Sequence, residues 1–198
     1  MNQRSAVILL GPPGSGKTTI TKKLTSGGSV QTLETGSLLR EEQSRGTELG
    51  EKLKPFLDEG KLAPTEIVAE VVAQGIQQLD ASVILFDGFP RREEEISAFF
   101  DQIKEGGFDL SAVLVLELSR SLAVDRILNR GERQDDNPDT VNERLDIYER
   151  ETGPVIEYFE TNYPDRTYKE SVDKPIEQIV DSIVSDLQQV GIDLSPSK

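Results

Sequence analysis

The stretch GPPGSGKT, residues 11–18, decides the fold of this protein. It fills the pattern G-x-x-x-x-G-K-S/T and follows the apolar run SAVILL of residues 5–10, which predicts a buried strand. Glycines in such a loop let backbone N–H groups point at phosphate oxygens, and the following helix adds the positive end of its dipole. A plain glycine-rich turn is the alternative. The residues predicted to bind a nucleoside triphosphate are Gly11, Gly14, Ser15, Gly16, Lys17, Thr18 and Thr19.

Apolar runs recur along the chain and predict five strands. The clearest lie at residues 5–10, 82–87 and 112–118, and weaker ones lie at 30–34 and 166–172. Between them, apolar residues repeat at helical spacing, most clearly at 176–190. Strands that are apolar on both faces and alternate with helices predict a parallel sheet covered on both sides. We therefore expect an α/β fold of the P-loop NTPase type, with a five-stranded parallel sheet.

The composition restricts the class of protein. The 198 residues predict one domain, and a net charge of −14 argues against non-specific binding to nucleic acid. The chain has no histidine, which excludes histidine-based catalysis, and no cysteine, which excludes disulfides and cysteine zinc sites. No apolar run approaches the length of a membrane span. We expect a cytoplasmic protein.

Two stretches are longer than the connections of such a sheet need. Residues 35–64 hold helical pieces before the helix at Pro64, and residues 131–137, GERQDDN, are a polar break between two helices. Both are predicted to lie over the C-terminal edge of the sheet, where ligands bind in such folds. The expected domain has a core of residues 1–34, 65–130 and 138–198, a first insertion at 35–64 and a short second insertion at 131–137. Asn137 is the predicted N-cap of the last core segment's first helix, with Pro138 at the first helical position.

Asp87 ends the apolar run VILFD of residues 83–87. An acid at this end of a strand partners a phosphate loop by holding the water shell of a magnesium ion, together with the hydroxyl of Thr18. A capping or turn aspartate is the alternative. We predict the magnesium-binding role, because the strand otherwise offers no second acid for the metal.

Several arginines surround the phosphate loop and the two insertions. Movement of a phosphoryl group requires neutralisation of negative charge, and arginines supply it by geometry when histidine is absent. Arg144 lies at the edge of an apolar helical stripe, where an arginine is expected to meet an anion. Each arginine taken singly is also explained by a surface ion pair. Asp135 and Asp136 are either a latch for Arg133 or a helix N-terminal charge preference. The candidates are Arg40, Arg91, Arg126, Arg130, Arg133 and Arg144.

Together these residues resemble the nucleoside monophosphate kinases, most closely the adenylate kinases with a short lid. The resemblance covers residues 5–190. GPPGSGKTT is similar to the phosphate loop of the family, residues 34–64 to its monophosphate-binding segment, and residues 130–159 to its lid and following helices. The string DGFPR of residues 87–91 is the most recognisable of the motifs.

The resemblance implies reversible phosphoryl transfer from ATP to a nucleoside monophosphate, with magnesium, without zinc and in a monomer. It implies that Lys17 and the loop amides bind the ATP phosphates, and that Arg126 stacks on the ATP adenine. Arg130, Arg133 and Arg144 would surround the transferred group. The implied acceptor residues are Thr35, Arg40, Leu62, Gly88, Arg91 and Glu95.

Three positions depart from the family pattern. Only the residues ERQ separate Gly131 from Asp135, so the lid is too short for the zinc-binding ribbon of long-lid relatives. Ser37 stands where the family usually has aspartate. Glu95 stands where it usually has a glutamine that reads the acceptor base. A carboxylate only accepts hydrogen bonds, so it matches the two donors of guanine better than the donor and acceptor of adenine.

The acceptor therefore stays open at this point. AMP is the first hypothesis, which Thr35 favours because pyrimidine-specific relatives tend to have alanine there. The second is another monophosphate, such as GMP or CMP, because of Glu95. The third is a non-catalytic nucleotide-binding module, against which Lys17, Asp87 and the arginines argue. The neighbours of Glu95 in the sequence, Arg92, Glu93 and Glu94, are expected to form the exposed first turn of a helix.

Overall fold

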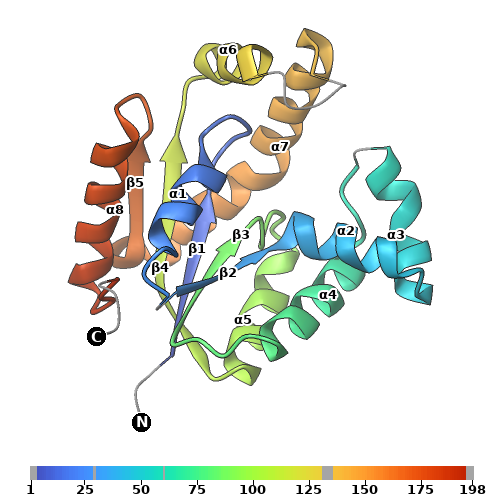
Figure 1. The fold of residues 1–198 in the computed structure, drawn as a ribbon, viewed down its shortest axis with the longest axis horizontal. Helices are drawn as coiled ribbons and strands as arrows, with labels where there is room; N and C mark the ends of the chain where they lie inside the picture. Colours follow the sequence, from blue (N-terminus) through green and yellow to red (C-terminus); the bar gives the residue numbers. More distant parts are fainter. Residues whose placement is uncertain (1–3, 29, 60, 131–135, 195–198) are drawn as a thin grey trace.

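A computed structural model describes residues 4–28, 30–59, 61–130 and 136–194. Its centre is a five-stranded sheet in the order β2-β3-β1-β4-β5, and all the neighbouring strands are parallel (Figure 1). The expected five-stranded parallel sheet is therefore confirmed. The strands are β1 (Arg4–Leu10), β2 (Val30–Glu34), β3 (Val83–Asp87), β4 (Phe108–Glu117) and β5 (Thr167–Ser171).

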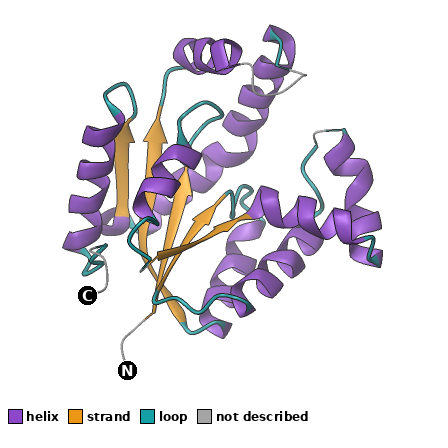
Figure 2. Cartoon of the chain, in the orientation of Figure 1, coloured by secondary structure: helices purple, strands orange, loops and turns teal. Residues whose placement is uncertain are grey.

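Helices connect the strands and cover both faces of the sheet (Figure 2). The predicted cap of the longest described helix is confirmed, because the Asn137 side-chain oxygen accepts hydrogen bonds from the N–H groups of Asp139 and Thr140, both at 3.1 Å. A short 3-10 helix spans Pro164–Arg166. The α-helices are α1 (Lys17–Leu24), α2 (Thr35–Arg45), α3 (Glu48–Asp58), α4 (Thr65–Gln77), α5 (Glu95–Glu105), α6 (Arg120–Arg130), α7 (Pro138–Asn162) and α8 (Ile176–Gln189).

The sheet is buried on both faces, and alternate residues of its strands enter two different cores. In β1, Ala6, Ile8 and Leu10 belong to a cluster with α4, α5 and α7. Val7 and Leu9 belong to a second cluster with α1 and α8. This alternation is why the strands read as continuous apolar runs. A third, smaller cluster joins α6 to α7 beyond the end of the sheet.

The strands β1, β2 and β3 all end at one edge of the sheet. Leu9 of β1 and Glu34 of β2 both lie beside Asp87 of β3 in the parallel register. The segments that follow these strands therefore leave the sheet side by side. They are the phosphate loop after β1, helix α2 after β2 and the loop of residues 88–94 after β3.

One local prediction is wrong. Helix α5 begins at Glu95, so Arg92, Glu93 and Glu94 lie in the turn before it and not in its first turn. Arg92 is not exposed either, because only 16% of its side chain is accessible and its guanidinium bonds to protein groups.

Among the described residues, none of the helices combines the length and the apolar character that crossing a membrane requires.

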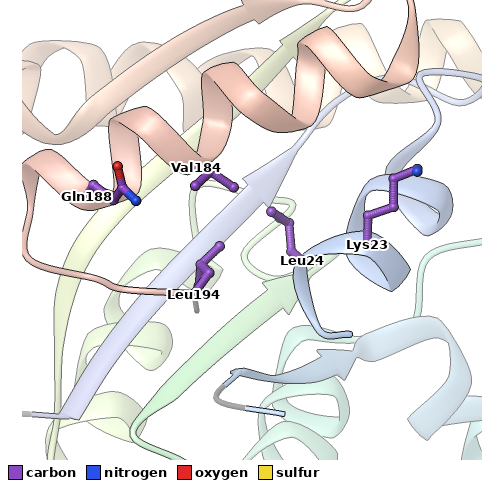
Figure 3. A pocket seen from close by; sticks show the side chains of 5 residues that line it. All are labelled: Lys23, Leu24, Val184, Gln188 and Leu194. Atoms are coloured by element: carbon purple, nitrogen blue, oxygen red, sulfur yellow. The ribbon is translucent and has the colours of Figure 1, made fainter. Parts of the chain in front are cut away.

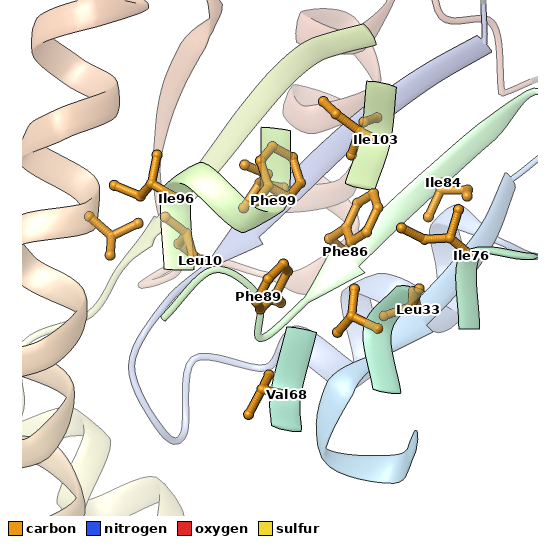
Figure 4. Packing of buried hydrophobic residues seen from close by; sticks show 14 of the residues in the cluster. Leu10, Leu33, Val68, Ile76, Ile84, Phe86, Phe89, Ile96, Phe99 and Ile103 are labelled. Atoms are coloured by element: carbon orange, nitrogen blue, oxygen red, sulfur yellow. The ribbon is translucent and has the colours of Figure 1, made fainter. Parts of the chain in front are cut away.

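Aromatic rings fill the core between the sheet and α5. Phe99 is 0% exposed, and its ring meets that of Phe86 edge to face with 5.2 Å between the ring centres (Figure 4). Phe89 packs on the same ring at 6.2 Å. Because Phe89 belongs to the loop that follows β3, this packing also anchors the start of that loop in the core.

We predict that Phe99→Ala lowers the free energy of unfolding by about 3–5 kcal/mol, since it leaves a cavity in a buried cluster. Phe100→Ala is the matched control, because Phe100 is only half-buried and stacks on Tyr163. The Phe100→Ala variant should lose clearly less free energy of unfolding than Phe99→Ala. Urea unfolding followed by circular dichroism measures both values, and equal losses for the two variants would contradict this account of the core.

Candidate active site

The phosphate loop runs from the end of β1 into α1. Gly16 is the N-cap of α1 and has a φ angle of +85°, in the left-handed region that favours glycine. The first turn of α1 contains no acid, so the positive end of the helix dipole meets no side-chain carboxylate of its own. The Lys17 ammonium donates hydrogen bonds to the backbone carbonyls of Gly11 at 2.7 Å and Pro12 at 3.1 Å. The local geometry suits an anion that replaces these carbonyls as the partner of Lys17.

Lys17, Asp87 and Arg91 form one electrostatic unit at this edge of the sheet. Burial lowers the pKa of Lys17 to about 8, the Asp87 carboxylate opposes this change, and the Arg91 charge adds to it. Burial also raises the pKa of the Asp87 carboxyl, while Lys17 and Arg91 act to lower it and Glu34 acts to raise it. The site therefore gathers two cations and two carboxylates from the ends of three strands.

The oxygen donors at this edge suit a magnesium ion. The Asp87 side chain is buried beside Lys17, and the Thr18 hydroxyl lies in the first turn of α1. Mg²⁺ prefers oxygen ligands and usually binds through one or two protein groups, waters and phosphates. In the described ranges, no group of three or more His, Cys, Asp or Glu side chains is placed to hold a metal ion. An ion at this position would need further ligands from a nucleotide or from water.

Arg91 lies on the loop that follows β3, and its conformation depends on Gly88. The Arg91 Nε atom donates to the Gly88 carbonyl at 3.1 Å. Gly88 has a φ angle of +88°, and a Cβ atom at this position would lie 2.7 Å from a terminal nitrogen of Arg91. Glycine thus leaves the space in which the guanidinium folds back toward the sheet edge.

Glu95 is enclosed by protein groups. Its residue is 3% exposed, and its carboxylate accepts hydrogen bonds from the backbone N–H of Arg91 at 2.7 Å and of Arg92 at 3.3 Å. The other oxygen accepts two bonds from the Arg92 guanidinium, at 3.2 and 3.0 Å. The sequence predicts a base-reading role for Glu95, and that role stays a prediction. The structure shows that the contacts of this carboxylate are with its own loop.

The other expected acceptor residues lie along the first insertion. Thr35 opens α2 and is 3% exposed, and its hydroxyl has no hydrogen-bond partner within the part of the chain that the structure describes. Arg40 is exposed. Its guanidinium donates a hydrogen bond to the Ser37 hydroxyl at 3.2 Å and lies 3.7 Å from the Glu34 carboxylate. Leu62 is half-buried in the segment between α3 and α4. Ser37 therefore accepts a hydrogen bond from Arg40 where the family usually has an aspartate.

The expected donor-side and lid arginines lie on α6 and α7. Arg126 is half-buried and donates to the Val172 carbonyl, just beyond β5, at 2.7 Å. Arg130 is exposed at the end of α6. The Arg144 guanidinium pairs with the Asp136 carboxylate at 2.8 Å, so the expected anion beside Arg144 is found within the protein. Residues 131–135, with Arg133 and most of the short lid, lie outside the described residues.

Two charged residues at the site escape prediction from the sequence. Glu34 ends β2 beside Asp87, and Arg92 joins the loop after β3 to the Ala63 carbonyl at 2.5 Å. A signal for Glu34 is nevertheless present in the sequence, because this acid ends a predicted strand just as Asp87 does. No pattern in the sequence finds the contact between Arg92 and Ala63, because this partner is a backbone group 29 positions away.

A cavity of about 200 Å³ lies at the other end of α1, between that helix and α8 (Figure 3). Lys23, Leu24, Val184, Gln188 and Leu194 line it. It contains none of the predicted site residues. The convergence of charged groups at the sheet edge, and not this cavity, marks the candidate active site.

Known proteins are similar to this chain over most of its length. Residues 9–163 match the family model described as "Adenylate kinase". The adenylate kinase of Corynebacterium urealyticum is 40% identical over 155 residues, which cover 78% of this chain and 85% of that protein. Adenylate kinases of Thermus thermophilus and Deinococcus deserti are 37% and 36% identical, and the matches cover 81% and 79% of this chain and 86% and 84% of those proteins.

We predict that ATP binding draws a proton onto Lys17. With a pKa of about 8, roughly half of the Lys17 side chains are neutral near that pH. Phosphate charge favours the ammonium form and raises this pKa. Binding at about pH 8 should therefore take up about half a proton, and binding at about pH 6.5 should take up almost none through Lys17.

Titration calorimetry in buffers of different ionisation enthalpy measures this uptake. The matched variant is Lys17→Arg, which keeps the positive charge but does not titrate in this range. Its uptake near pH 8 should fall to nearly zero. The same uptake in the variant and the parent protein would show that another group takes the proton.

Proposed function

The chain belongs to the adenylate kinase family and is a nucleoside monophosphate kinase, and we propose that AMP is its phosphoryl acceptor. The proposed reaction is the reversible conversion of ATP and AMP into two molecules of ADP. The observation that carries the phosphoryl transfer is the meeting of Lys17, Asp87 and Arg91 at the edge where β1 and β3 end, and the enclosure of Glu95 carries the choice of AMP. A cation for the donor phosphates, an acid for a metal and a cation for the acceptor phosphate are thereby close together.

We assign the donor phosphates to the loop of residues 11–18 and to Lys17. The ammonium exchanges its two backbone carbonyl partners for phosphate oxygens, which are charged and therefore form stronger hydrogen bonds. Asp87 and Thr18 would hold a magnesium ion, which supplies charge neutralisation to the ATP phosphates when bound. Arg126, held by the Val172 carbonyl, is the proposed partner of the ATP adenine.

We assign Arg130, Arg133 and Arg144 to the transferred phosphoryl group. In the structure the Asp136 carboxylate neutralises Arg144 and keeps it oriented. A phosphoryl group at this position would compete with Asp136 for the same guanidinium. Transfer of this kind needs positioning and neutralisation of charge and no covalent intermediate, which agrees with a site without histidine.

We assign the acceptor phosphate to Arg40 and Arg91, and the acceptor nucleoside to the surroundings of Thr35, Leu62 and Gly88. The buried Thr35 hydroxyl has no partner in the described parts of the protein, so a ligand that reached it would satisfy it. The case for GMP or CMP depends on a Glu95 carboxylate that faces the base. The enclosure of this carboxylate by Arg91 and Arg92 supports AMP over those acceptors.

The two insertions are proposed to act as moving parts. Residues 35–64, which contain α2 and α3, would close over the acceptor, and residues 131–137 would close over the phosphates as a lid. Closure would remove water, which competes with the acceptor for the phosphoryl group. In Figure 1, α2 and α3 project from the side of the sheet at which β2 lies.

We predict that Arg91→Ala raises the KM for the acceptor at least about 100-fold, since it removes charge-assisted hydrogen bonds to a phosphate. The KM for ATP should change by less than about twofold, because Lys17 and the loop remain. A coupled assay for ADP with one substrate varied at a time measures both constants. Arg150→Ala is the control, because Arg150 is exposed on α7 and pairs only with its neighbour Glu151 among the described ion pairs. An unchanged acceptor KM in Arg91→Ala would contradict the proposed site.

The same assay with AMP, GMP, CMP and UMP at fixed ATP tests the acceptor. We predict that kcat/KM for AMP exceeds that for each of the others at least about tenfold, because base-edge hydrogen bonds discriminate strongly between analogues. A preference for GMP of that size would overturn AMP as the acceptor while leaving the phosphoryl transfer intact.

A further inference from the structure

Arg92, in the loop after β3, and Glu95, the first residue of α5, form an ion pair that is largely removed from water. The Arg92 side chain is 16% exposed and that of Glu95 is 3% exposed, and their charged groups approach to 3.0 Å. We propose that this pair positions Arg91, and that Glu95 acts on the reaction through Arg91 and not through the acceptor base. The proposal rests on the proposed function, in which Arg91 binds the acceptor phosphate.

The Glu95 carboxylate has no acceptor capacity to spare. A carboxylate offers about four lone-pair sites, and four hydrogen bonds reach this one: two from the backbone N–H groups of Arg91 and Arg92, and two from the Arg92 guanidinium. The shortest, at 2.7 Å, comes from the N–H of Arg91 itself. Glu95 therefore fixes the backbone from which the phosphate-binding guanidinium extends.

Arg92 extends the same unit to the first insertion. One of its terminal nitrogens bonds both to Glu95 and to the Ala63 carbonyl, the latter at 2.5 Å. A second link runs in parallel, since Glu94 lies 3.4 Å from the Arg92 guanidinium and accepts a hydrogen bond from the Thr65 hydroxyl at 2.7 Å. Ala63 and Thr65 flank Pro64, where the insertion returns to helix α4. The position of Arg91 is thus tied to the point at which the insertion joins the core.

A base-reading role for Glu95 would require this unit to open. The carboxylate would have to leave two backbone N–H groups and a guanidinium, all of which are partly or fully removed from water. Buried donors without partners are costly, and a buried charge without its partner is costlier still. The amino group of a base is a neutral donor and offers less in return than a guanidinium. The positioning role keeps every one of these groups paired.

The two roles predict different kinetics. If Glu95 reads the base, Glu95→Gln changes the ratio of kcat/KM between AMP and GMP. If Glu95 positions Arg91, Glu95→Gln turns an amide NH₂ toward groups that are themselves donors, and the Arg91 loop shifts. The loss then falls on the phosphate, which AMP and GMP share. The expected result is a rise of about tenfold in the acceptor KM for both nucleotides, with their ratio unchanged within about twofold.

The experiment compares Glu95→Gln, Arg92→Met and the double variant, with KM and kcat measured for AMP, GMP and ATP. The two single variants should raise the acceptor KM by similar factors, and the double variant should be no worse than the more damaged single one, because both act on one unit. The KM for ATP should stay within about twofold of the parent value in all of them. Arg150→Met is the matched control, since it breaks an exposed arginine–glutamate pair and should change nothing.

Stability is measured alongside, because a buried pair also supports the fold. Arg92→Lys keeps the charge but cannot form the forked contact with Glu95 and Ala63. It is the variant to use if Arg92→Met does not fold, and it should raise the acceptor KM without a matching loss of thermal stability. An acceptor KM that follows thermal stability across all the variants and the control would reduce the pair to a structural role and overturn the proposal.

Two other outcomes overturn it. A change of about tenfold or more in the ratio of AMP to GMP on Glu95→Gln would assign Glu95 to the base. Unchanged acceptor constants in the Arg92 and Glu95 variants, with a large loss in Arg91→Ala, would leave the proposed function standing and remove this inference alone. An acceptor KM that is unchanged in Arg91→Ala would remove both.

Discussion

The parallel register of β1, β2 and β3 is the constraint on which the site depends. Leu9, Glu34 and Asp87 lie beside one another, so the phosphate loop, α2 and the Arg91 loop all leave the sheet at one edge. Two apolar cores hold this register, because a slip of one residue in any strand would exchange the side chains that face them. The chemistry of the site is thus supported by apolar packing on both faces of the sheet.

Charge is the second constraint, and it acts locally against the composition of the chain. A protein with a net charge of −14 repels phosphates at long range. The site opposes this repulsion with cations that protein groups already orient. Two loop carbonyls orient Lys17, the Val172 carbonyl orients Arg126, and the Asp136 carboxylate orients Arg144. Because these side chains are already oriented before binding, the entropy cost that the binding free energy must offset is smaller. At Lys17 and Arg144, a phosphate can replace the present partner or share the cation with it.

Much of the fold and part of the site are predictable from local sequence. Four of the strands, the helix start at Gly16 and the cap at Asn137 are found close to where the sequence predicts them, because each depends on neighbouring residues. The fourth strand in the sequence is also present, but it begins at Phe108, four residues before the predicted run at 112–118. The stretch around Arg92 is where prediction fails. A charged turn followed by a helix reads as a solvated surface, and three adjacent glutamates strengthen that interpretation. The approach of the α4 start buries Arg92 and Glu95 instead, and nothing in their own stretch encodes that approach.

The sequence by itself determined the phosphate loop, the apolar strands and the set of charged residues available for chemistry, because these are properties of contiguous residues and their periodicity. Only the tertiary structure decided which distant backbone groups the arginines of the site meet. The Ala63 carbonyl that receives Arg92 lies 29 positions away in the sequence, and the Val172 carbonyl that receives Arg126 lies 46 positions away. A backbone carbonyl is the same at every residue, so no side-chain pattern announces it, and only the folded path of the chain brings it to its partner.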